Sequence, residues 1–216
     1  PAAEVQEHAG AAQSGQPTGS RVGLHKSRSI VLRLSALFAV DAFAGGFIVQ
    51  SILAYWFVMR FGADPGQLGA IFFGANIMSG VSALLAARIA ARIRLIRTMV
   101  FTHIPSNILL MLVPLMPTLP LAILVLLVRH SISQMDVPTR QSYTMAVVSP
   151  DERSAAAGIT GIARTTGSSL SPVFVGPLMA SAALLNSVFF IAGGLKIIYD
   201  LLLYRRFRRL PPPEEG

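Results

Sequence analysis

The stretch QLGAIFFGANIMSGVSALLAA, residues 67–87, indicates the fold class because it contains no charged side chain. The hydrocarbon core of a bilayer is about 30 Å thick, and a helix needs about 20 largely apolar residues to cross it. A run of this length and composition predicts a helix that spans a membrane. Neighbouring segments of the chain are similarly long and apolar.

Five further stretches have a similar length and composition, some with polar interruptions. The six predicted spans lie at about 34–59, 67–87, 98–116, 119–142, 154–179 and 184–204. The chain of 216 residues is 53% hydrophobic and 13% charged, whereas soluble domains are roughly 25% charged. The sequence therefore predicts an all-α membrane protein with a six-helix transmembrane domain at residues 30–205.

The two ends of the chain differ from this apolar middle. Residues 1–29 are polar, rich in Ala, Gly, Ser and Gln, and lack the apolar centre of a signal peptide. This composition predicts a disordered cytoplasmic leader or a linker, and residues 206–216 are predicted to form a cytoplasmic tail. Because the first residue is Pro1 rather than Met, we expect the sequence to be a fragment or a processed chain.

Lys and Arg residues are distributed unequally between the two sides of the predicted spans. The leader, the second and fourth loops and the tail hold 14 of the 18, whereas the three alternating loops hold one, Arg60. Cytoplasmic segments of membrane proteins carry such an excess. The bias predicts that both termini face the cytoplasm, as an even number of spans requires, in the inner or plasma membrane of the cell.

Three charged residues are predicted to lie deep within the spans. Asp41, Arg129 and Arg164 fall roughly 11–15 Å from a membrane surface, at about 1.5 Å per helical residue. A charge at this depth costs at least ~2.5–3.5 kcal/mol and usually faces a protein interior or a watery cavity. We expect Asp41 to be a protonatable or substrate-contacting acid that pairs with Arg129, in a pathway that includes Arg164. The alternative is a buried ion pair that only holds helices together.

The fourth span carries a polar stripe. Arg129, Ser133, Asp136 and Arg140 recur at intervals of four, three and four, which places them on one helix face. Such a face fits a helix that lines an aqueous path for a substrate or a coupling ion, with Asp136 among the candidates. It equally fits a helix whose inner end leaves the membrane.

Polar residues of the third and sixth spans have more local interpretations. Lys196 and Asp200 are one helical turn apart and are expected to pair near the cytoplasmic end. His103 is a weaker candidate for a proton relay. Pro105 is predicted to kink the third helix.

Small residues line one face of the fifth span and one face of the second. They are Gly158, Gly161, Thr165, Ser168, Pro172 and Gly176 in the fifth, and Gly69, Asn76, Gly80, Ala83 and Ala87 in the second. Small faces let membrane helices approach closely, so packing alone explains both. A second interpretation is a sliding or bending surface, with Pro172 as a bending point.

A distinctive motif, SPDERSAAAG, begins the fifth span at residues 149–158. Ser149 stands at the cap position, Pro150 follows it, and Glu152 comes three residues after the cap. This order is a capping box that predicts the start of a helix at the cytoplasmic surface.

The same run resembles a family signature. Pro150, Glu152, Arg153 and Gly158 match the Pro-x-Glu-Arg-x-x-Ala-x-Gly pattern that precedes the eleventh helix of major facilitator superfamily transporters. The preceding MDVPTRQ, residues 135–141, is similar to the end of the tenth helix in that superfamily.

The loop after the second span is similar to another superfamily pattern, Gly-x-x-x-Asp-Arg-x-Gly-Arg-Arg. The sequence ARIAARIRLIR, residues 87–97, keeps the basic character of that loop through Arg88, Arg92 and Arg97. Ala91 stands where the family has Asp, and Arg94 stands where it has Gly. The charge-relay role of the family's Asp therefore does not carry over.

The resemblance covers nearly all of residues 30–205 and implies a fold and a function. The superfamily has twelve helices in two halves, and this chain looks like the C-terminal half, with its first and fourth spans beside the central cavity. It implies secondary active transport of a small solute by alternating access, with coupling to protons as a hypothesis. The implied partners are that solute, the lipid bilayer and an N-terminal six-helix half.

Other functional classes have less support from the sequence. A six-helix carrier or permease subunit that works as a homodimer is the main alternative. The sequence contains no zinc-binding His pair, nucleophile elbow or phosphate loop, so we expect no enzyme activity, no metal site and no cofactor. The net charge of +8 does not indicate nucleic-acid binding, because the basic clusters lack interleaved aromatic residues.

Overall fold

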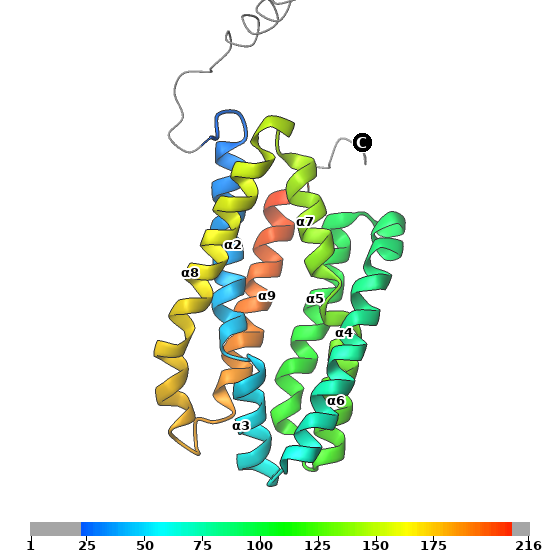
Figure 1. The fold of residues 1–216 in the computed structure, drawn as a ribbon, viewed down its shortest axis with the longest axis vertical. Helices are drawn as coiled ribbons and strands as arrows, with labels where there is room; N and C mark the ends of the chain where they lie inside the picture. The colour runs from blue at the N-terminus through cyan, green and yellow to red at the C-terminus, as the bar shows by residue number, and fades with distance from the viewer. Residues whose placement is uncertain (1–22, 209–216) are drawn as a thin grey trace, which may run out of the picture.

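A computed structural model describes residues 23–208, which form a bundle of helices (Figure 1). The α-helices are α2 (Arg28–Gly46), α3 (Gln50–Phe61), α4 (Pro65–Ile93), α5 (Leu95–Leu112), α6 (Leu119–Ser133), α7 (Asp136–Val147), α8 (Arg153–Met179) and α9 (Ser187–Phe207). The short helices η1 (Val113–Leu115) and η2 (Pro150–Glu152) precede α6 and α8. Most of the predicted leader and tail, at 1–22 and 209–216, lies outside the described residues.

These helices account for the predicted spans, and the prediction of an all-α membrane fold is confirmed. The first span is α2 with α3, the third is α5 with η1, and the fourth is α6 with α7. Within residues 23–208, five segments are long and apolar enough to cross a membrane: Arg28–Phe61, Pro65–Ile93, Leu95–Leu115, Leu119–Val147 and Ser187–Phe207. The remaining helix, α8, has 27 residues and is rich in Gly, Ser and Thr.

The first span is broken between α2 and α3. Gly45 and Gly46 end α2, and glycine has a low helix propensity because its backbone loses the most freedom on folding. Val49 then takes an extended conformation before α3 begins. Such breaks inside a membrane are tolerated where protein surrounds them or where they line a cavity.

The fourth span is broken between α6 and α7. Pro138 is the third residue of α7. It has no N–H to donate, and in a continuous helix its ring would collide with the carbonyl of Gln134. The span therefore divides just before this proline, between Ser133 and Asp136.

The predicted basic loop at residues 87–97 is almost entirely helical. Only Arg94 separates α4 from α5, because the basic side chains around it are good helix formers and extend both helices. Arg94 has φ 74° and ψ 152°, a conformation that is strained for any residue with a Cβ. This is the position at which the family loop that the sequence resembles carries Gly.

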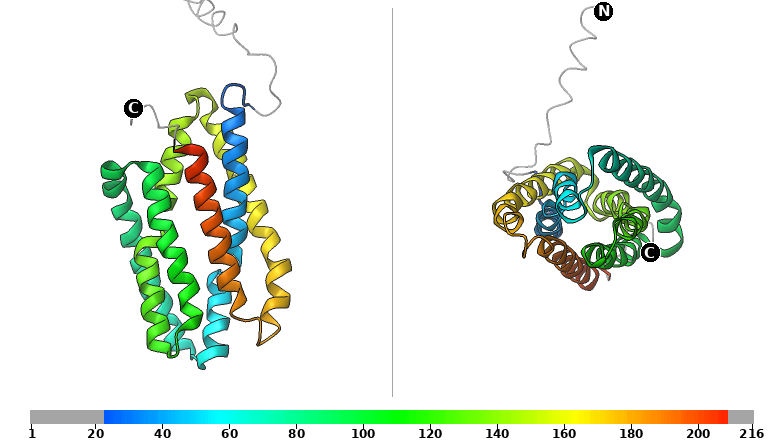
Figure 2. Two further views of the ribbon diagram at one scale, coloured as in Figure 1. Left: turned by 180° about the vertical axis from the view of Figure 1, so that it is seen from behind. Right: turned by 90° about the horizontal axis from the view of Figure 1, so that it is seen from below.

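The helices pack in two groups that meet along α5 and α9. α2 packs on α8 and α9, and α4 and α5 pack on α6, while α5 also contacts α7 and α9. Figures 1 and 2 show α9 and α5 side by side in the views from both faces. One buried apolar cluster gathers around Trp56 and Phe189, and a second around Leu34 and Tyr199. Along α2 and α9, polar residues occupy the stretch between these clusters.

α2 and α8 approach each other closely at a glycine that the predicted small face did not include. A Cβ atom on Gly167 would lie 2.3 Å from the backbone oxygen of Ala39. Nearby, a Cβ on Gly46 would lie 2.2 Å from the Ser171 hydroxyl, which donates a hydrogen bond of 2.6 Å to the Phe43 carbonyl. The glycines let these two helices touch backbone to backbone.

The predicted small faces make no such contact within residues 23–208. A Cβ on Gly158, Gly161 or Gly176 would have no atom of the described chain within 4 Å. Pro172 on this face of α8 is exposed, as are Gly69, Asn76, Gly80, Ala83 and Ala87 on α4. The small residues on both faces are therefore exposed in the described part of the chain.

The predicted capping box of the SPDERSAAAG motif is wrong. Ser149 makes no side-chain cap, and residues 150–152 form η2. The buried carboxylate of Glu152 instead accepts hydrogen bonds from the backbone N–H groups of Lys26, at 2.7 Å, and Ser27, at 2.8 Å, and also from that of His25. Glu152 thus binds the backbone that leads into α2, and Ser27 is 125 residues away from it in sequence.

The acidity of Glu152 follows from this arrangement. Burial raises the pKa of a carboxyl, but the hydrogen bonds from His25, Ser27 and Lys26 outweigh it and lower the pKa of Glu152 to about 2. The imidazole of His25 lies 2.8 Å from the same carboxylate and 3.1 Å from Asp151. Glu152 is therefore ionised at neutral pH and accepts these hydrogen bonds as a carboxylate.

Candidate functional site

Asp41 lies at the centre of a buried charge cluster. Its carboxylate, 4% exposed in α2, has Lys196 Nζ 2.6 Å from Oδ1 and Arg140 Nη1 2.9 Å from Oδ2. Arg164 Nη1 lies 3.5 Å from the same Oδ2. One carboxylate thus faces three cations from α9, α7 and α8, and they stabilise its ionised form.

Arg140 joins Asp41 to Asp136. Its Nη1 lies 3.2 Å from Asp136 Oδ2, one turn earlier in α7. The centre of its guanidinium lies 5.3 Å from the centroid of the Phe38 ring, within the range of a cation–π contact. Asp136 and Arg140 are both buried, so these contacts fix the Arg140 side chain from three sides.

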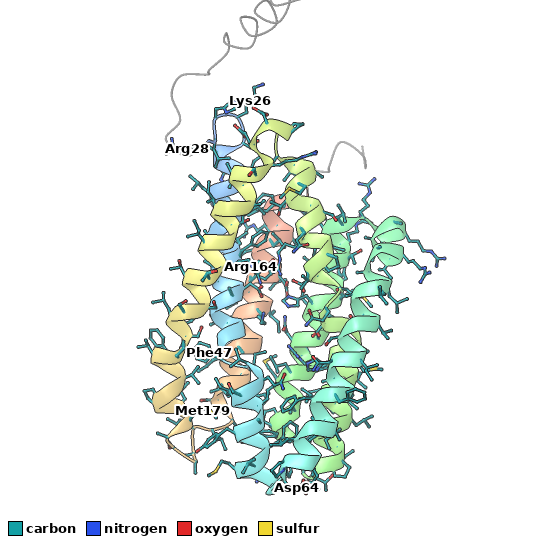
Figure 3. The ribbon with its side chains drawn as sticks, viewed as in Figure 1. Lys26, Arg28, Phe47, Asp64, Arg164 and Met179 are labelled. Atoms are coloured by element: carbon teal, nitrogen blue, oxygen red, sulfur yellow. The ribbon has the colours of Figure 1, made fainter. Side chains whose placement is uncertain are left out.

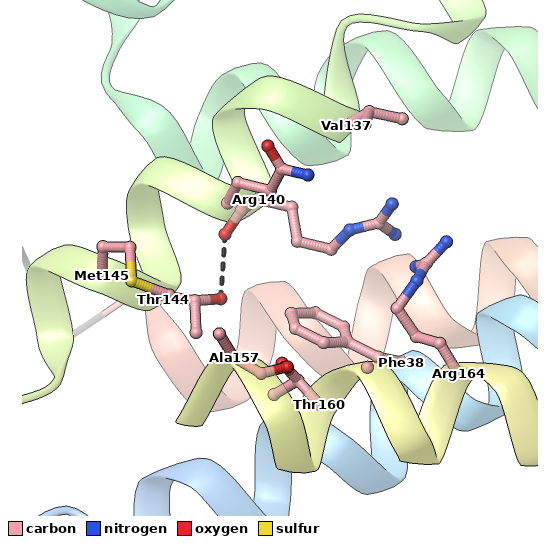
Figure 4. A pocket seen from close by; sticks show the side chains of 10 residues that line it. Phe38, Val137, Arg140, Thr144, Met145, Ala157, Thr160 and Arg164 are labelled. Carbon is pink, nitrogen blue, oxygen red and sulfur yellow. Dashed lines mark hydrogen bonds between the residues drawn. The ribbon is translucent and has the colours of Figure 1, made fainter. Parts of the chain in front are cut away.

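A pocket of about 460 Å³ opens beside this cluster. It is lined by Phe38, Val137, Arg140, Gln141, Thr144, Met145, Ala157, Thr160, Gly161 and Arg164. Figure 4 shows the guanidinium groups of Arg140 and Arg164 approaching each other across it. Arg164 lies near the middle of the bundle, between Lys26 at one end and Asp64 at the other (Figure 3). The pocket therefore extends from the middle of the bundle toward the end that carries Glu152, since Met145 and Ala157 also line it.

The predicted pair between Asp41 and Arg129 is wrong. In residues 23–208 the ion-pair partners of Asp41 are Arg140, Arg164 and Lys196. The break in the fourth span gives the physical reason: α7 contacts α2, whereas α6 packs on α4 and α5. The break thus brings Arg140 to Asp41, while Arg129 stays buried in α6 with no hydrogen-bond partner for its Nε among the described residues.

The predicted pair between Lys196 and Asp200 is also wrong, because the two side chains face different helices. Lys196 reaches Asp41 on α2. Asp200 lies 2.9 Å from His103 Nδ1 and accepts a hydrogen bond of 3.3 Å from Asn107, both on α5. The result is a second buried polar contact, between α9 and α5, beside the Asp41 cluster.

Three of the four predicted pathway residues converge in one cluster. Asp41, Asp136 and Arg164 meet around Arg140, while Arg129 stays apart. Lys196 was missed as a partner of Asp41, although a lysine inside an apolar span was a signal for it. The role of Arg140 was visible only as one member of a polar stripe.

The predicted loop-motif residues lie at the end of the bundle that carries Glu152. Arg88, Arg92 and Arg97 are exposed on α4 and α5, and Gly158 is exposed on α8. Pro150 begins η2. Arg153 donates a hydrogen bond of 2.9 Å from Nε to the carbonyl of Met145, so it ties the start of α8 to α7. Pro105 lies inside α5.

Comparison with known proteins gives matches in sequence. The family model of the Major Facilitator Superfamily matches residues 35–216. A curated relative from Saccharomyces cerevisiae, the uncharacterized membrane protein YJR124C, is 28% identical over 176 residues, which are 81% of this chain and 39% of the relative. The chain therefore spans well under half the length of that relative. No solved structure matches the chain.

Proposed function

The chain belongs to the Major Facilitator Superfamily of membrane transporters, and from this premise we propose that it serves as the C-terminal half of a secondary transporter. In this proposal the whole protein moves a small solute across the cell membrane by alternating access. The chain is a multi-pass membrane protein. The proposal adds which half of the transporter it forms, where the solute binds and which residue couples transport to protons.

The buried cluster around Asp41 carries this proposal. Charged side chains inside a membrane are costly and usually mark a substrate or ion pathway. Here Asp41, Arg140 and Lys196 are each at most 7% exposed, and the half-exposed Arg164 connects them to a pocket. Two helices that belong to broken spans, α2 and α7, contribute Phe38, Val137 and Arg140 to the lining of this pocket, as expected for helices that line a transport site.

The assignment to one half of a longer fold has separate support. The chain spans 39% of its relative, and the small residues on the faces of α4 and α8 are exposed within residues 23–208. We propose that the N-terminal half packs on these faces. The excess of basic residues at the ends of α4 and α9 favours an orientation with both termini of this half in the cytoplasm.

Asp41 is the proposed coupling residue. Its three cations hold it ionised in this conformation. If alternating access separates Asp41 from Arg164 or Lys196, the carboxylate loses stabilisation in a low-dielectric interior and gains affinity for a proton. Proton binding and helix movement are then linked.

The test is solute flux through the full-length protein, encoded by the gene that contains this chain, in proteoliposomes with an imposed pH gradient. We expect gradient-driven flux in the wild type and its loss in Asp41→Asn. Two controls accompany this variant. Asp41→Glu retains the charge, and Asp64→Asn removes an exposed acid at the start of α4. We expect flux to be retained in both.

The outcomes separate the parts of the proposal. Flux that survives in Asp41→Asn would remove Asp41 from the coupling step and leave it a structural ion pair. Flux that ignores the pH gradient in the wild type would refute proton coupling. Absence of any solute flux would refute the transport proposal.

A further inference from the structure

We propose that the pocket between Arg140 and Arg164 binds an oxyanion, a carboxylate or phosphate group of the transported solute. This inference rests on the proposed function and adds the chemical class of the solute. It follows from the charge balance of the cluster, from the position of Arg164 and from the lining of the pocket.

The contact network around Asp41 has more cations than carboxylates. Arg140, Arg164 and Lys196 lie within 3.5 Å of Asp41 or Asp136. Three positive charges thus share two negative charges. Arg129 on α6 and Asp200 on α9 are also buried, and together they add one charge of each sign. A buried excess of one sign favours binding of a counter-ion.

Arg164 is the cation with the weakest attachment to the protein. It lies 3.5 Å from Asp41, compared with 2.9 Å for Arg140 and 2.6 Å for Lys196. Its Nη1 has no hydrogen-bond partner among the described residues. Its side chain is also 38% exposed, compared with 6% for Arg140 and 9% for Lys196. Arg164 therefore has a buried donor without a hydrogen-bond partner among the described residues, on a side chain that is partly exposed and lines the pocket.

The geometry of the two arginines suits an oxyanion. Their guanidinium groups approach from opposite walls, α7 and α8 (Figure 4). Guanidinium groups recognise planar carboxylates and phosphates through paired N–H donors. Because both arginines already converge on Asp41 Oδ2, an incoming oxyanion would occupy a site adjacent to the one that this carboxylate occupies.

The other lining residues indicate an organic ion. The hydroxyls of Thr144 and Thr160 donate to the backbone carbonyls of Arg140 and Ala156, so the donors that remain for the ligand are the arginines and the Gln141 amide. Phe38 and Met145 supply an apolar surface. A volume of about 460 Å³ is within the range of small-molecule sites, roughly 300–1,000 Å³.

The test measures binding to the purified full-length protein in nanodiscs of phosphatidylcholine. Radiolabelled succinate and inorganic phosphate are the probes, with chloride at matched ionic strength as the background. We expect saturable binding of at least one probe, and a loss of affinity of at least tenfold in Arg164→Gln, which is the expected effect of losing one charge-assisted contact. Arg164→Lys should restore part of the affinity.

A matched variant, Arg92→Gln, removes the same charge from an exposed position on α4, and it should bind the probes as the wild type does. Arg164 is half-exposed, so Arg164→Gln is expected to fold, and its unfolding temperature checks this. Equal binding in Arg164→Gln and the wild type, or no binding of either probe, would overturn the inference.

Two further results identify the source of the oxyanion and separate the inference from the proposed function. Stabilisation that depends on Arg164 and appears only with phosphatidylglycerol in the nanodisc would assign the site to a lipid headgroup and overturn the solute assignment. Flux of neutral solutes without probe binding would overturn the inference and leave transport standing. Arg164-dependent binding without flux of any solute would refute transport and leave the anion site standing.

Discussion

Lys196 Nζ lies 2.6 Å from Asp41 Oδ1, although Asp200 stands one turn away on the same helix as Lys196. The contact joins α9 to α2 across 155 residues of sequence. Both side chains are less than 10% exposed. The Lys196 side chain is therefore buried in the interior of the bundle.

The first prediction is that this pair is energetically coupled. Asp41→Asn should lower stability by about 3–5 kcal/mol, because removal of one partner leaves buried cations uncompensated. Lys196→Met removes one of these cations. The loss of stability in the double variant Asp41→Asn/Lys196→Met should therefore be smaller than the sum of the two single losses by about 0.5–3 kcal/mol. Thermal unfolding of the purified protein in one detergent measures all four proteins. Strict additivity would contradict a direct contact.

The second prediction concerns Glu152 and pH. Because its folded pKa, about 2, is below its usual value of 4.5, its stabilising contribution is complete above about pH 4.5 and is lost as the pH falls toward 2. Glu152→Gln should therefore unfold at a lower temperature than the wild type at pH 7. The difference between the two should shrink below pH 4.5.

The control for Glu152 is its neighbour Asp151, whose side chain is 59% exposed. Asp151→Asn should unfold close to the wild-type temperature at each pH. A difference between Glu152→Gln and the wild type that stays constant down to pH 2 would contradict the assigned ionisation of Glu152.

The third prediction is that Arg94→Gly stabilises the protein. The positive φ of Arg94 is strained for residues with a Cβ, at a cost of order 1–3 kcal/mol, and glycine adopts it freely with a smaller entropic cost. The expected gain is about 1 kcal/mol. Arg92→Gly, two residues earlier inside α4, is the matched variant and should lose about 1 kcal/mol. Equal effects of the two substitutions in thermal unfolding would refute the strain.

The fourth prediction tests the contact between α2 and α8. Gly167→Ala should destabilise by about 1–3 kcal/mol, because its Cβ has no room against Ala39. Gly194→Ala, in α9, has no atom within 4 Å of the added Cβ and should be neutral or stabilising. Crosslinking of cysteines placed on α2 and α8 would report whether Gly167→Ala separates the helices. Unchanged stability and crosslinking would contradict the close approach.

Five of the six predicted spans are long and apolar enough to cross a membrane within residues 23–208, because the length of an apolar run is read directly from the order of residues. The sequence also identified Asp41, Asp136 and Arg164 as buried or cavity-facing charges, since each interrupts an apolar run. The family resemblance was likewise present in the short motifs around Glu152 and Arg94.

The sequence was not sufficient to predict which charges pair. Pairing depends on the rotation and the breaks of each helix, and the division of the fourth span before Pro138 brings Arg140 rather than Arg129 to Asp41. The same limit applies to Glu152, whose partners are backbone N–H groups. Such donors exist in every segment and leave no mark in the sequence.

The contact of Glu152 with the segment ahead of α2 couples the positions of α2 and α8. Glu152 holds the chain at His25–Ser27, and α8 continues from it to Arg164 in roughly three turns. Gly167 then seals α8 against α2 just beyond. α8 and the segment that leads through α2 are therefore in contact at two points, on either side of Arg164 in sequence. We expect a displacement of His25–Ser27 to move α2 and α8 together, and Arg164 with them.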